Sequence, residues 1–140
     1  MSESFVGNGS CLCGVIEFTA GNAEKSIGAC HCNTCRKWGG GPLIGVHCGN
    51  EVSFLGEENI SIYGSSDWAE RGFCKICGSH LYYRLKKNMH HFIPAGLFED
   101  QSQFVLERQS YIDRKPPYYS FANHTHDLTE DEMVEKYGIS

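Results

Sequence analysis

Residues 30–41 of this chain read CHCNTCRKWGGG, so that three cysteines in a C-x-C-x2-C spacing run directly into three glycines. In an extended segment, residues two apart point to the same face, so Cys30 and Cys32 can present their sulfur atoms side by side while His31 points away. Cys35 comes round on the following turn, which places three thiolates on one metal ion and leaves one corner of a tetrahedron free. The alternative is a closed structural site whose fourth ligand lies elsewhere in the chain.

A second cysteine pair, Cys74 and Cys77, has the C-x2-C spacing of a zinc knuckle, in which two sulfur atoms converge across a tight turn. This pair needs a partner, and Cys11 and Cys13 supply one because they are also two residues apart and share a face. We expect these four cysteines to hold a structural zinc ion that ties an N-terminal hairpin to the middle of the chain and stabilises the fold by on the order of ten kcal/mol.

Cys48 is left over at the end of an apolar strand. We expect it to be a buried small side chain rather than a ligand, whereas contact with the triplet would close that site.

The composition is that of one globular domain, which we expect to cover residues 1–140 without a linker. No apolar run approaches the length of a membrane span, so the chain is expected to be soluble and to have no membrane partner. Residues 1–5 do not resemble a signal peptide, so we expect a cytoplasmic location and reduced, metal-binding cysteines rather than disulfides. Because the net charge is −5 and lysine and arginine are scattered, no nucleic-acid partner is expected.

Alternation of apolar and polar residues predicts a mainly β fold of short antiparallel strands separated by Gly, Asn, Ser and Pro. The expected strands cover residues 15–19, 43–48, 52–55, 60–63, 68–74, 80–85, 90–95 and 104–109. Helix is scarce: a short turn over residues 34–38 would stop at the glycines, and Thr129 with Glu132 forms a capping box that predicts a peripheral helix near the end. We expect the strand histidines to be hydrogen-bonded or exposed, since none has a ligand spacing: His31, His80, His90 and His91.

Three cysteine motifs together resemble the glutathione-dependent formaldehyde-activating (GFA) family. They are Gly9-Ser10-Cys11-Leu12-Cys13-Gly14, Cys30-His31-Cys32-x2-Cys35-Arg36-Lys37 and Cys74-x2-Cys77-Gly78-Ser79. Residues 65–73 and 115–122 also resemble segments of one branch of that family. The resemblance implies a β-tent fold of zinc-stapled antiparallel sheets with short peripheral helices. It implies a structural zinc on Cys11, Cys13, Cys74 and Cys77, and a second zinc on Cys30, Cys32 and Cys35 with its fourth corner open to a thiol.

The resemblance further implies a carbon–sulfur lyase that acts on glutathione adducts of the S-hydroxymethylglutathione type, formed with formaldehyde or another electrophile. In such an enzyme Cys30, Cys32 and Cys35 would be the catalytic residues, because the zinc ion they hold ionises the substrate thiol. Glutathione is anionic, so Arg36 and Lys37 are candidates for a positive rim, with surface charge as the plainer explanation. The residues that follow are Trp38, Gly39 and Gly40. We expect them to contact glutathione, or else only to pack against the core and to form a turn.

Two other classes of function fit parts of this sequence. A noncatalytic zinc module that carries glutathione or docks a protein partner needs no open coordination position, so a fourth ligand other than a thiol on the triplet would favour it. A methionine sulfoxide reductase on a related fold would need a redox cysteine late in the chain, and no cysteine follows Cys77. The lyase is therefore the function that we expect.

Overall fold

The computed structural model describes residues 3–137 and contains many short strands with few helices. In chain order the strands are β1 (Ser4–Ser10), β2 (Glu17–Glu24), β3 (Ser26–Cys30), β4 (Leu43–Gly49), β5 (Val52–Leu55), β6 (Ile60–Tyr63), β7 (Ala69–Cys74), β8 (His80–Leu85), β9 (His91–Pro94), β10 (Val105–Ser110) and β11 (His126–Leu128). The α-helices are α1 (Asn33–Gly39) and α2 (Glu130–Tyr137), and short 3-10 turns are η1 (Glu57–Asn59), η2 (Ala95–Leu97) and η3 (Ile112–Arg114). The mainly β fold expected from the sequence is confirmed.

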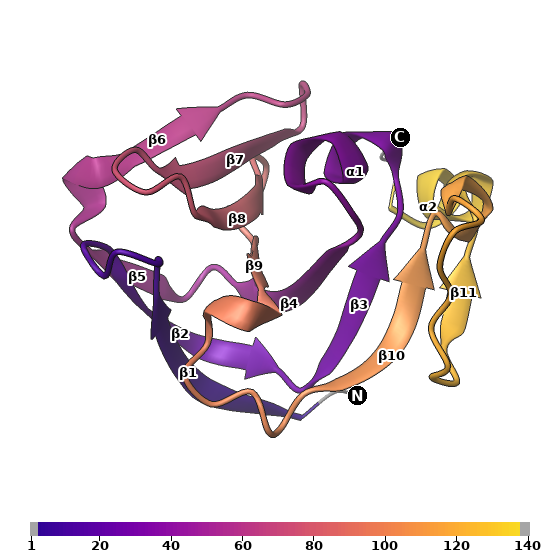
Figure 1. Ribbon diagram of the computed structural model, residues 1–140, viewed down its shortest axis with the longest axis horizontal. Helices are drawn as coiled ribbons and strands as arrows, with labels where there is room; N and C mark the ends of the chain where they lie inside the picture. The colour runs from indigo at the N-terminus through magenta and orange to yellow at the C-terminus, as the bar shows by residue number, and fades with distance from the viewer. Residues whose placement is uncertain (1–2, 138–140) are drawn as a thin grey trace.

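The strands form two sheets of unequal size. The smaller has the order β1-β2-β5, and the larger has the order β11-β10-β3-β4-β9-β8-β7-β6. Figure 1 shows the larger sheet curving from β11 and β10 round to β7 and β6, with β1, β2 and β5 along its lower side. Most neighbouring strands are antiparallel, as expected, but β10 runs parallel to both β3 and β11. The expectation of wholly antiparallel sheets is thus wrong at this edge. Between β3 and β10 the chain passes through the rest of the larger sheet, and β10 then begins at the same end of the sheet as β3, so the two strands run in the same direction.

Three strands lie outside the expected set: β1, β3 and β11. The sequence of β1, SFVGNGS, contains too few alternating apolar residues to predict a strand, yet it pairs with β2 along most of its length. The expected strand at residues 15–19 begins instead at Glu17, because the Cys11 N–H donates to the Ile16 carbonyl at 3.1 Å and closes a turn over the intervening residues. The first cysteine pair therefore lies in the β1–β2 turn.

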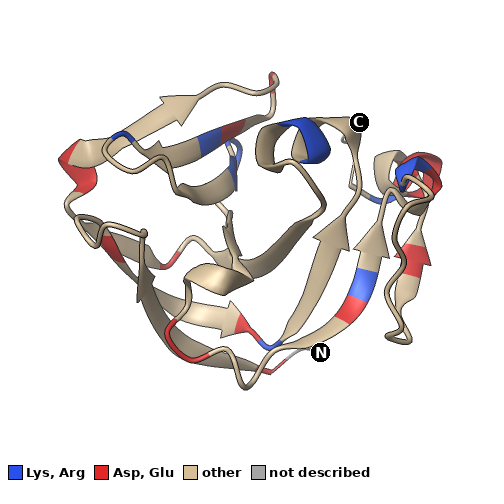
Figure 2. Ribbon diagram, in the orientation of Figure 1, with Lys and Arg blue, Asp and Glu red and all other residues tan. Residues whose placement is uncertain are grey.

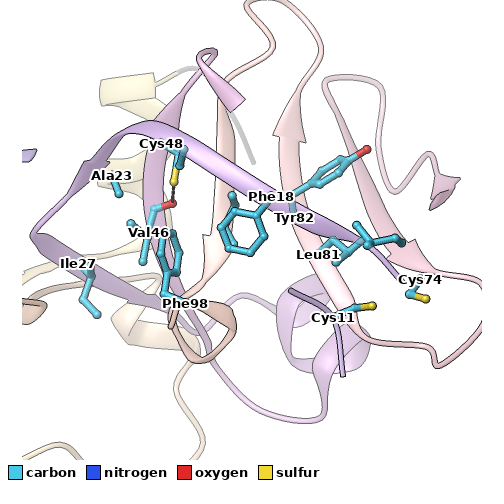
Figure 3. Packing of buried hydrophobic residues seen from close by; sticks show 13 residues of the cluster. Cys11, Phe18, Ala23, Ile27, Val46, Cys48, Cys74, Leu81, Tyr82 and Phe98 are labelled. Atoms are coloured by element: carbon cyan, nitrogen blue, oxygen red, sulfur yellow. Dashed lines mark hydrogen bonds between the residues drawn. The ribbon is translucent and has the colours of Figure 1, made fainter. Parts of the chain in front are cut away.

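The core lies between the two sheets and is closely packed by aliphatic and aromatic side chains. Phe18 enters it from the smaller sheet and Val46 from the larger one (Figure 3), and Ile16 joins the same cluster from the turn before β2. Burial of each such large apolar side chain contributes about 1.5 to 3 kcal/mol. Cys48 is fully buried in this cluster, and its thiol donates to the Val46 carbonyl at 3.3 Å. Cys48 is thus the buried small side chain that its sequence context predicts.

The short helix α1 follows the cysteine triplet and is closed at both ends. At its start the Cys32 sulfur accepts a hydrogen bond from the Cys35 N–H at 3.3 Å, so a triplet cysteine is itself the N-cap. At its end Gly40 has a φ of 84°, and its N–H donates to the Arg36 carbonyl at 2.8 Å. Because a left-handed residue of this kind favours glycine, the glycine run ends the helix as predicted.

The predicted capping box is present at the start of α2. The Thr129 N–H donates to Glu132 Oε1 at 2.9 Å, and the Glu132 N–H donates to Thr129 Oγ1 at 3.2 Å. The helix buries no side chain completely and lies at the margin of the molecule beside η3 (Figure 1). Within residues 3–137, no helix has the length and apolar character needed to cross a membrane.

Replacement of Gly9 should test the close approach of β1 to the segment after β9. A Cβ atom on Gly9 would overlap the Leu97 carbonyl oxygen, which belongs to the backbone and cannot rotate away. We therefore expect Gly9→Ala to lower the free energy of unfolding by about 1 to 3 kcal/mol, the usual cost of overpacking. The matched control is Gly64→Ala, because a Cβ there meets nothing within 4 Å. Urea unfolding that gives equal stabilities for the two variants would contradict this account.

A second prediction concerns His91, which burial keeps neutral. Its Nδ1–H donates to the Gly49 carbonyl at 3.3 Å, and its buried Nε2 has no hydrogen-bond partner among residues 3–137. Burial lowers the pKa of His91 below its ordinary value of 6.5. Since the unfolded chain then takes up the proton first, stability should fall as the pH drops below about 6.5 and level off below the folded-state pKa.

Replacement of His91 by glutamine removes this titration. Between pH 7 and pH 5.5, His91→Gln should lose about 1 kcal/mol less stability than the wild type, measured by urea unfolding. Release of metal at low pH affects both proteins alike, so the difference between their slopes isolates His91. Parallel pH profiles would show that His91 does not contribute.

Candidate metal centres

The sulfur atoms of Cys11, Cys13, Cys74 and Cys77 all lie within 4.8 Å of one another. Cys11 and Cys13 are 3.6 Å apart, and Cys13 and Cys74 are 3.9 Å apart, measured between sulfur atoms. A tetrahedral zinc ion with four sulfur ligands at about 2.3 Å requires sulfur–sulfur separations of about 3.8 Å. These separations are far longer than a disulfide bond, and the cysteines are free. The four thiols therefore fit a zinc ion.

Two turns bring this four-cysteine group together. One is the β1–β2 turn, and the other joins β7 to β8, where the Cys77 N–H donates to the Cys74 sulfur at 3.4 Å. Ser79 connects the two turns, because its hydroxyl oxygen accepts from the Leu12 N–H at 3.0 Å and lies 3.2 Å from the Cys77 sulfur. The hydrogen bond from Ser79 lowers the pKa of Cys77 to about 5. The turn thus favours the thiolate form that a metal ion binds.

The second group consists of Cys30, Cys32 and Cys35, whose sulfur atoms also lie within 4.8 Å of one another. Cys30 is the last residue of β3, Cys32 caps α1, and Cys35 lies in its first turn. Cys35 is buried, and the other two are half-buried. The predicted convergence of the three thiols is therefore observed, with no fourth Cys, His, Asp or Glu in the group among the residues that the structure describes.

Close contact between these three thiols separates their protonation states. Hydrogen bonding to Cys32 and Cys35 raises the pKa of Cys30, and hydrogen bonding from Cys30 lowers the pKa of Cys32. For Cys35, contact with Cys30 lowers the pKa, but contact with Cys32 and burial outweigh it and the net direction is upward. The metal-free cluster thus concentrates negative charge on Cys32, and a metal ion must displace the protons of the other two.

Arg71 is a member of this neighbourhood that sequence reasoning did not identify. Both terminal nitrogens of its guanidinium lie 3.6 Å from the Cys35 sulfur, and its Nε donates to Ser65 Oγ at 3.2 Å. The side chain is buried and lies over the ring of Tyr83, 4.9 Å from its centroid. A lone arginine in a strand has no spacing signal, so the only available clue was its place in the segment that resembles the GFA family.

His31 lies between two cysteines of the triplet but is directed elsewhere. It is fully buried; its Nε2–H donates to Gln109 Oε1 at 2.8 Å, and its Nδ1 accepts from the Tyr119 hydroxyl at 2.7 Å. The ring thus fastens the triplet to β10 and to the segment before β11. Neither sulfur group includes a histidine or Cys48, and Figure 3 shows Cys48 on the opposite side of Phe18 from Cys11 and Cys74.

A pocket of about 390 Å³ adjoins the three-cysteine group on the side of Cys35. Trp38 and Gly39 of α1 line it, together with His80, whose ring stacks on Trp38 with centroids 4.5 Å apart. The remaining wall is formed by apolar side chains and glycines from the start of β4 and the residues before it, from the turn after β7, and from the end of β9 and the residues after it. None of the lining residues is a lysine, arginine, aspartate or glutamate. The pocket therefore offers mainly backbone and apolar contacts beside the sulfur atoms.

The other residues expected to contact glutathione lie outside this lining. Arg36 and Lys37 give α1 its positive charge, visible in Figure 2, and Arg36 Nε donates to the His31 carbonyl at 2.9 Å. Gly40 is exposed at the end of the helix. Contacts between glutathione and Arg36, Lys37 or Gly40 stay predictions.

Comparison with known proteins gives one consistent family. Residues 6–114 match the family described as glutathione-dependent formaldehyde-activating enzyme. An uncharacterized lyase of Schizosaccharomyces pombe is 39% identical over 128 residues, which cover 91% of this chain and 93% of the relative. A Podospora anserina protein that carries the name of a glutathione-dependent formaldehyde-activating enzyme is 34% identical over 127 residues, covering 81% of this chain and 60% of the relative.

The fold also has a counterpart among solved structures. A crystal structure of a Rhodobacter sphaeroides protein aligns with a TM-score of 0.52 at 22% sequence identity, covering 66% of this chain and 87% of the other. This likeness concerns the fold alone.

Replacement of one cysteine in the four-cysteine group should remove one metal ion and weaken the fold. We expect Cys74→Ala to lower the zinc content by about one ion per chain and the free energy of unfolding by several kcal/mol. The matched control is Cys48→Ser, which alters an equally buried cysteine outside both groups and should keep the zinc content unchanged. Elemental analysis and thermal unfolding measure both effects. Full zinc in Cys74→Ala, or a lost ion in Cys48→Ser, would show that the ligands are divided differently.

Proposed function

Because this chain belongs to the glutathione-dependent formaldehyde-activating family, we propose that it is a zinc-dependent lyase that makes and breaks the carbon–sulfur bond of a glutathione adduct. The family match and the relative that is named a lyase support an enzyme of the lyase class. The observation that carries the proposal is a group of three thiols, beside a pocket, for which residues 3–137 supply no fourth ligand of the kind present in the other group. A closed site would have no position for a substrate thiol.

In this proposal the two cysteine groups have different tasks. Cys11, Cys13, Cys74 and Cys77 hold a structural zinc, supported by their complete set of ligands and their position between two hairpin turns. Cys30, Cys32 and Cys35 hold the second zinc. An ion held there by three thiolates would keep one soft coordination position, at which it could bind a thiol and favour its ionised form.

The proposed reaction adds the glutathione thiolate to formaldehyde. The sulfur gives an electron pair to the carbonyl carbon, the π pair of the carbonyl moves to its oxygen, and this oxygen takes up one proton to give S-hydroxymethylglutathione. Cleavage is the same step reversed: the hydroxyl loses its proton, the carbonyl re-forms, and the sulfur leaves with the bonding pair. The three cysteines would determine where the sulfur lies, and Trp38 and His80, which line the pocket, would cover one side of the reacting carbon.

Glutathione itself is expected to lie along α1 and the turn that follows. Trp38 and Gly39 line the pocket and would contact it, while Gly40 leaves room for a peptide-like backbone at the helix end. Arg36 and Lys37 would attract its carboxylates to the rim of the pocket, since the lining itself is uncharged. The substrate would therefore be positioned by its central sulfur atom and by charge at its carboxylates.

Cobalt substitution tests this proposal directly. A Co²⁺-loaded protein should show a sulfur-to-metal charge-transfer band that grows when glutathione is added and does not change with S-methylglutathione, because the methylated sulfur cannot ionise. Cys32→Ala should abolish the response while the four-cysteine group keeps the fold. The same samples should accelerate cleavage of S-hydroxymethylglutathione only when Cys32 is intact.

The outcomes separate the lyase from a noncatalytic module. An equal response to both ligands, or to neither, would exclude coordination through sulfur and favour a module that docks a protein partner. A response to glutathione without accelerated cleavage would favour a glutathione carrier. Cleavage that survives Cys32→Ala would place the active site elsewhere.

A further inference from the structure

We propose that Arg71 is a positioning residue of the three-cysteine centre, where its guanidinium holds the Cys35 sulfur and offsets one negative charge so that an anionic thiol can bind. This inference rests on the proposed function, because it concerns how the second centre accepts its ligand. Arg71 would touch neither substrate nor reacting atoms, and it would act through Cys35.

The geometry fixes the guanidinium from three sides. Both terminal nitrogens approach the Cys35 sulfur at 3.6 Å, within the range of N–H···S hydrogen bonds. On the opposite edge Nε donates to Ser65 Oγ at 3.2 Å, and the flat face lies 4.9 Å from the centroid of Tyr83. Arg71 is only 4% exposed, so this orientation is set by packing and not by solvent.

A buried guanidinium requires a negative partner, because an unpaired charge in the interior is costly. Among residues 3–137, the ion pairs between side chains involve other residues and leave Arg71 without a carboxylate. The group that its two terminal nitrogens face is the Cys35 sulfur. Once a metal ion is bound, Cys35 is a thiolate, and the charge of Arg71 then faces a negative sulfur atom.

The charge balance explains why one centre needs an arginine and the other does not. Zinc with three thiolates has a formal charge of about −1, and a fourth thiolate from an anionic ligand would bring it to about −2. The positive charge of Arg71 makes the net charge of the centre less negative by one unit, both before and after the anionic ligand binds. Among residues 3–137, the hydrogen bonds to the four-cysteine group come from neutral donors such as the Cys77 N–H and the Ser79 hydroxyl, and in this proposal the group binds no further anion.

Arg84 provides an internal comparison on the neighbouring strand β8. Its guanidinium also lies 4.9 Å from a tyrosine ring, that of Tyr82, but Arg84 Nε donates to Glu70 at 2.9 Å. Arg84 is thus an arginine in a similar strand environment whose charge is already paired with a carboxylate. Its replacement removes a strand arginine and a cation–π contact without touching a cysteine.

The experiment uses the full chain loaded with zinc and compares Arg71→Met, Arg71→Lys and Arg84→Met with the wild type. Competition with a chelator gives the zinc affinity of each centre, and calorimetry gives the affinity for glutathione. Arg71→Met should weaken zinc binding at the three-cysteine centre by about 10- to 100-fold, as expected for a residue that supports a metal ligand, and leave the four-cysteine centre unchanged. Glutathione binding should weaken by at least about tenfold.

Arg71→Lys separates the effect of charge from that of geometry. A lysine keeps the positive charge but cannot hold one sulfur with two parallel N–H groups. We therefore expect Arg71→Lys to recover most of the glutathione affinity and less of the zinc affinity. Arg84→Met should leave both affinities within about twofold of the wild type.

The results distinguish failure of this inference from failure of the proposed function. Two zinc ions per wild-type chain, with both affinities unchanged in Arg71→Met, would overturn the role of Arg71 alone. A wild-type chain that binds a single zinc ion would overturn the proposed function and the inference with it. If Arg71→Met does not fold, Ser65→Ala serves instead, because it removes the hydroxyl that braces Nε. Ser65→Ala and Arg71→Lys that both behave as the wild type would overturn the inference.

Discussion

A contact between sulfur atoms joins the turn of the smaller sheet to the larger sheet at one end of the core. Cys13, in the β1–β2 turn, and Cys74, at the end of β7, are separated by 61 residues, yet their sulfur atoms lie 3.9 Å apart. Thiolates at such distances repel one another unless a cation lies between them. Without a metal ion, the four-cysteine group therefore destabilises the fold. With a metal ion, it cross-links the β1–β2 turn to the end of β7. In a chain of 140 residues, such a cross-link supplements a core of limited size.

The two cysteine groups are built from the same backbone device. In each, a C-x2-C pair forms a turn in which the N–H of the second cysteine donates to the sulfur of the first, at 3.3 Å for Cys35 to Cys32 and 3.4 Å for Cys77 to Cys74. A left-handed glycine, Gly78, directly follows Cys77, whereas after Cys35 the chain continues as α1 and the left-handed glycine is its C-cap, Gly40. The groups differ in what completes them. A second cysteine pair closes one group, whereas one further cysteine and a buried arginine accompany the other.

Short-range features of the fold could be predicted from the sequence, and long-range ones could not. Strands β5, β6 and β8 have the predicted bounds, because alternating side chains and flanking turn residues act within a few positions. The capping box at Thr129 is local in the same way. By contrast, β1 and β3 are rich in small residues and are strands because of their pairing partners, and the parallel pairing of β10 with β3 joins segments far apart in the chain.

The same limit applies to the candidate site. Cysteine spacing was enough to predict which sulfur atoms converge, because a metal ion restricts the distance between its ligands. The guanidinium beside Cys35 had no such signal, since Arg71 reaches it from a strand 36 residues away.

Within α1, helix geometry divides the remaining candidates. Cys35, Trp38 and Gly39 share a face at positions i, i+3 and i+4 and line the pocket, while Arg36 and Lys37 lie outside it. Exposed charges of that kind act weakly and are screened by salt over about 8 Å. A buried guanidinium is screened much less, so in the proposed centre Arg71 would act on an incoming thiolate at the sulfur atoms, and the charges of α1 would act mainly on its approach.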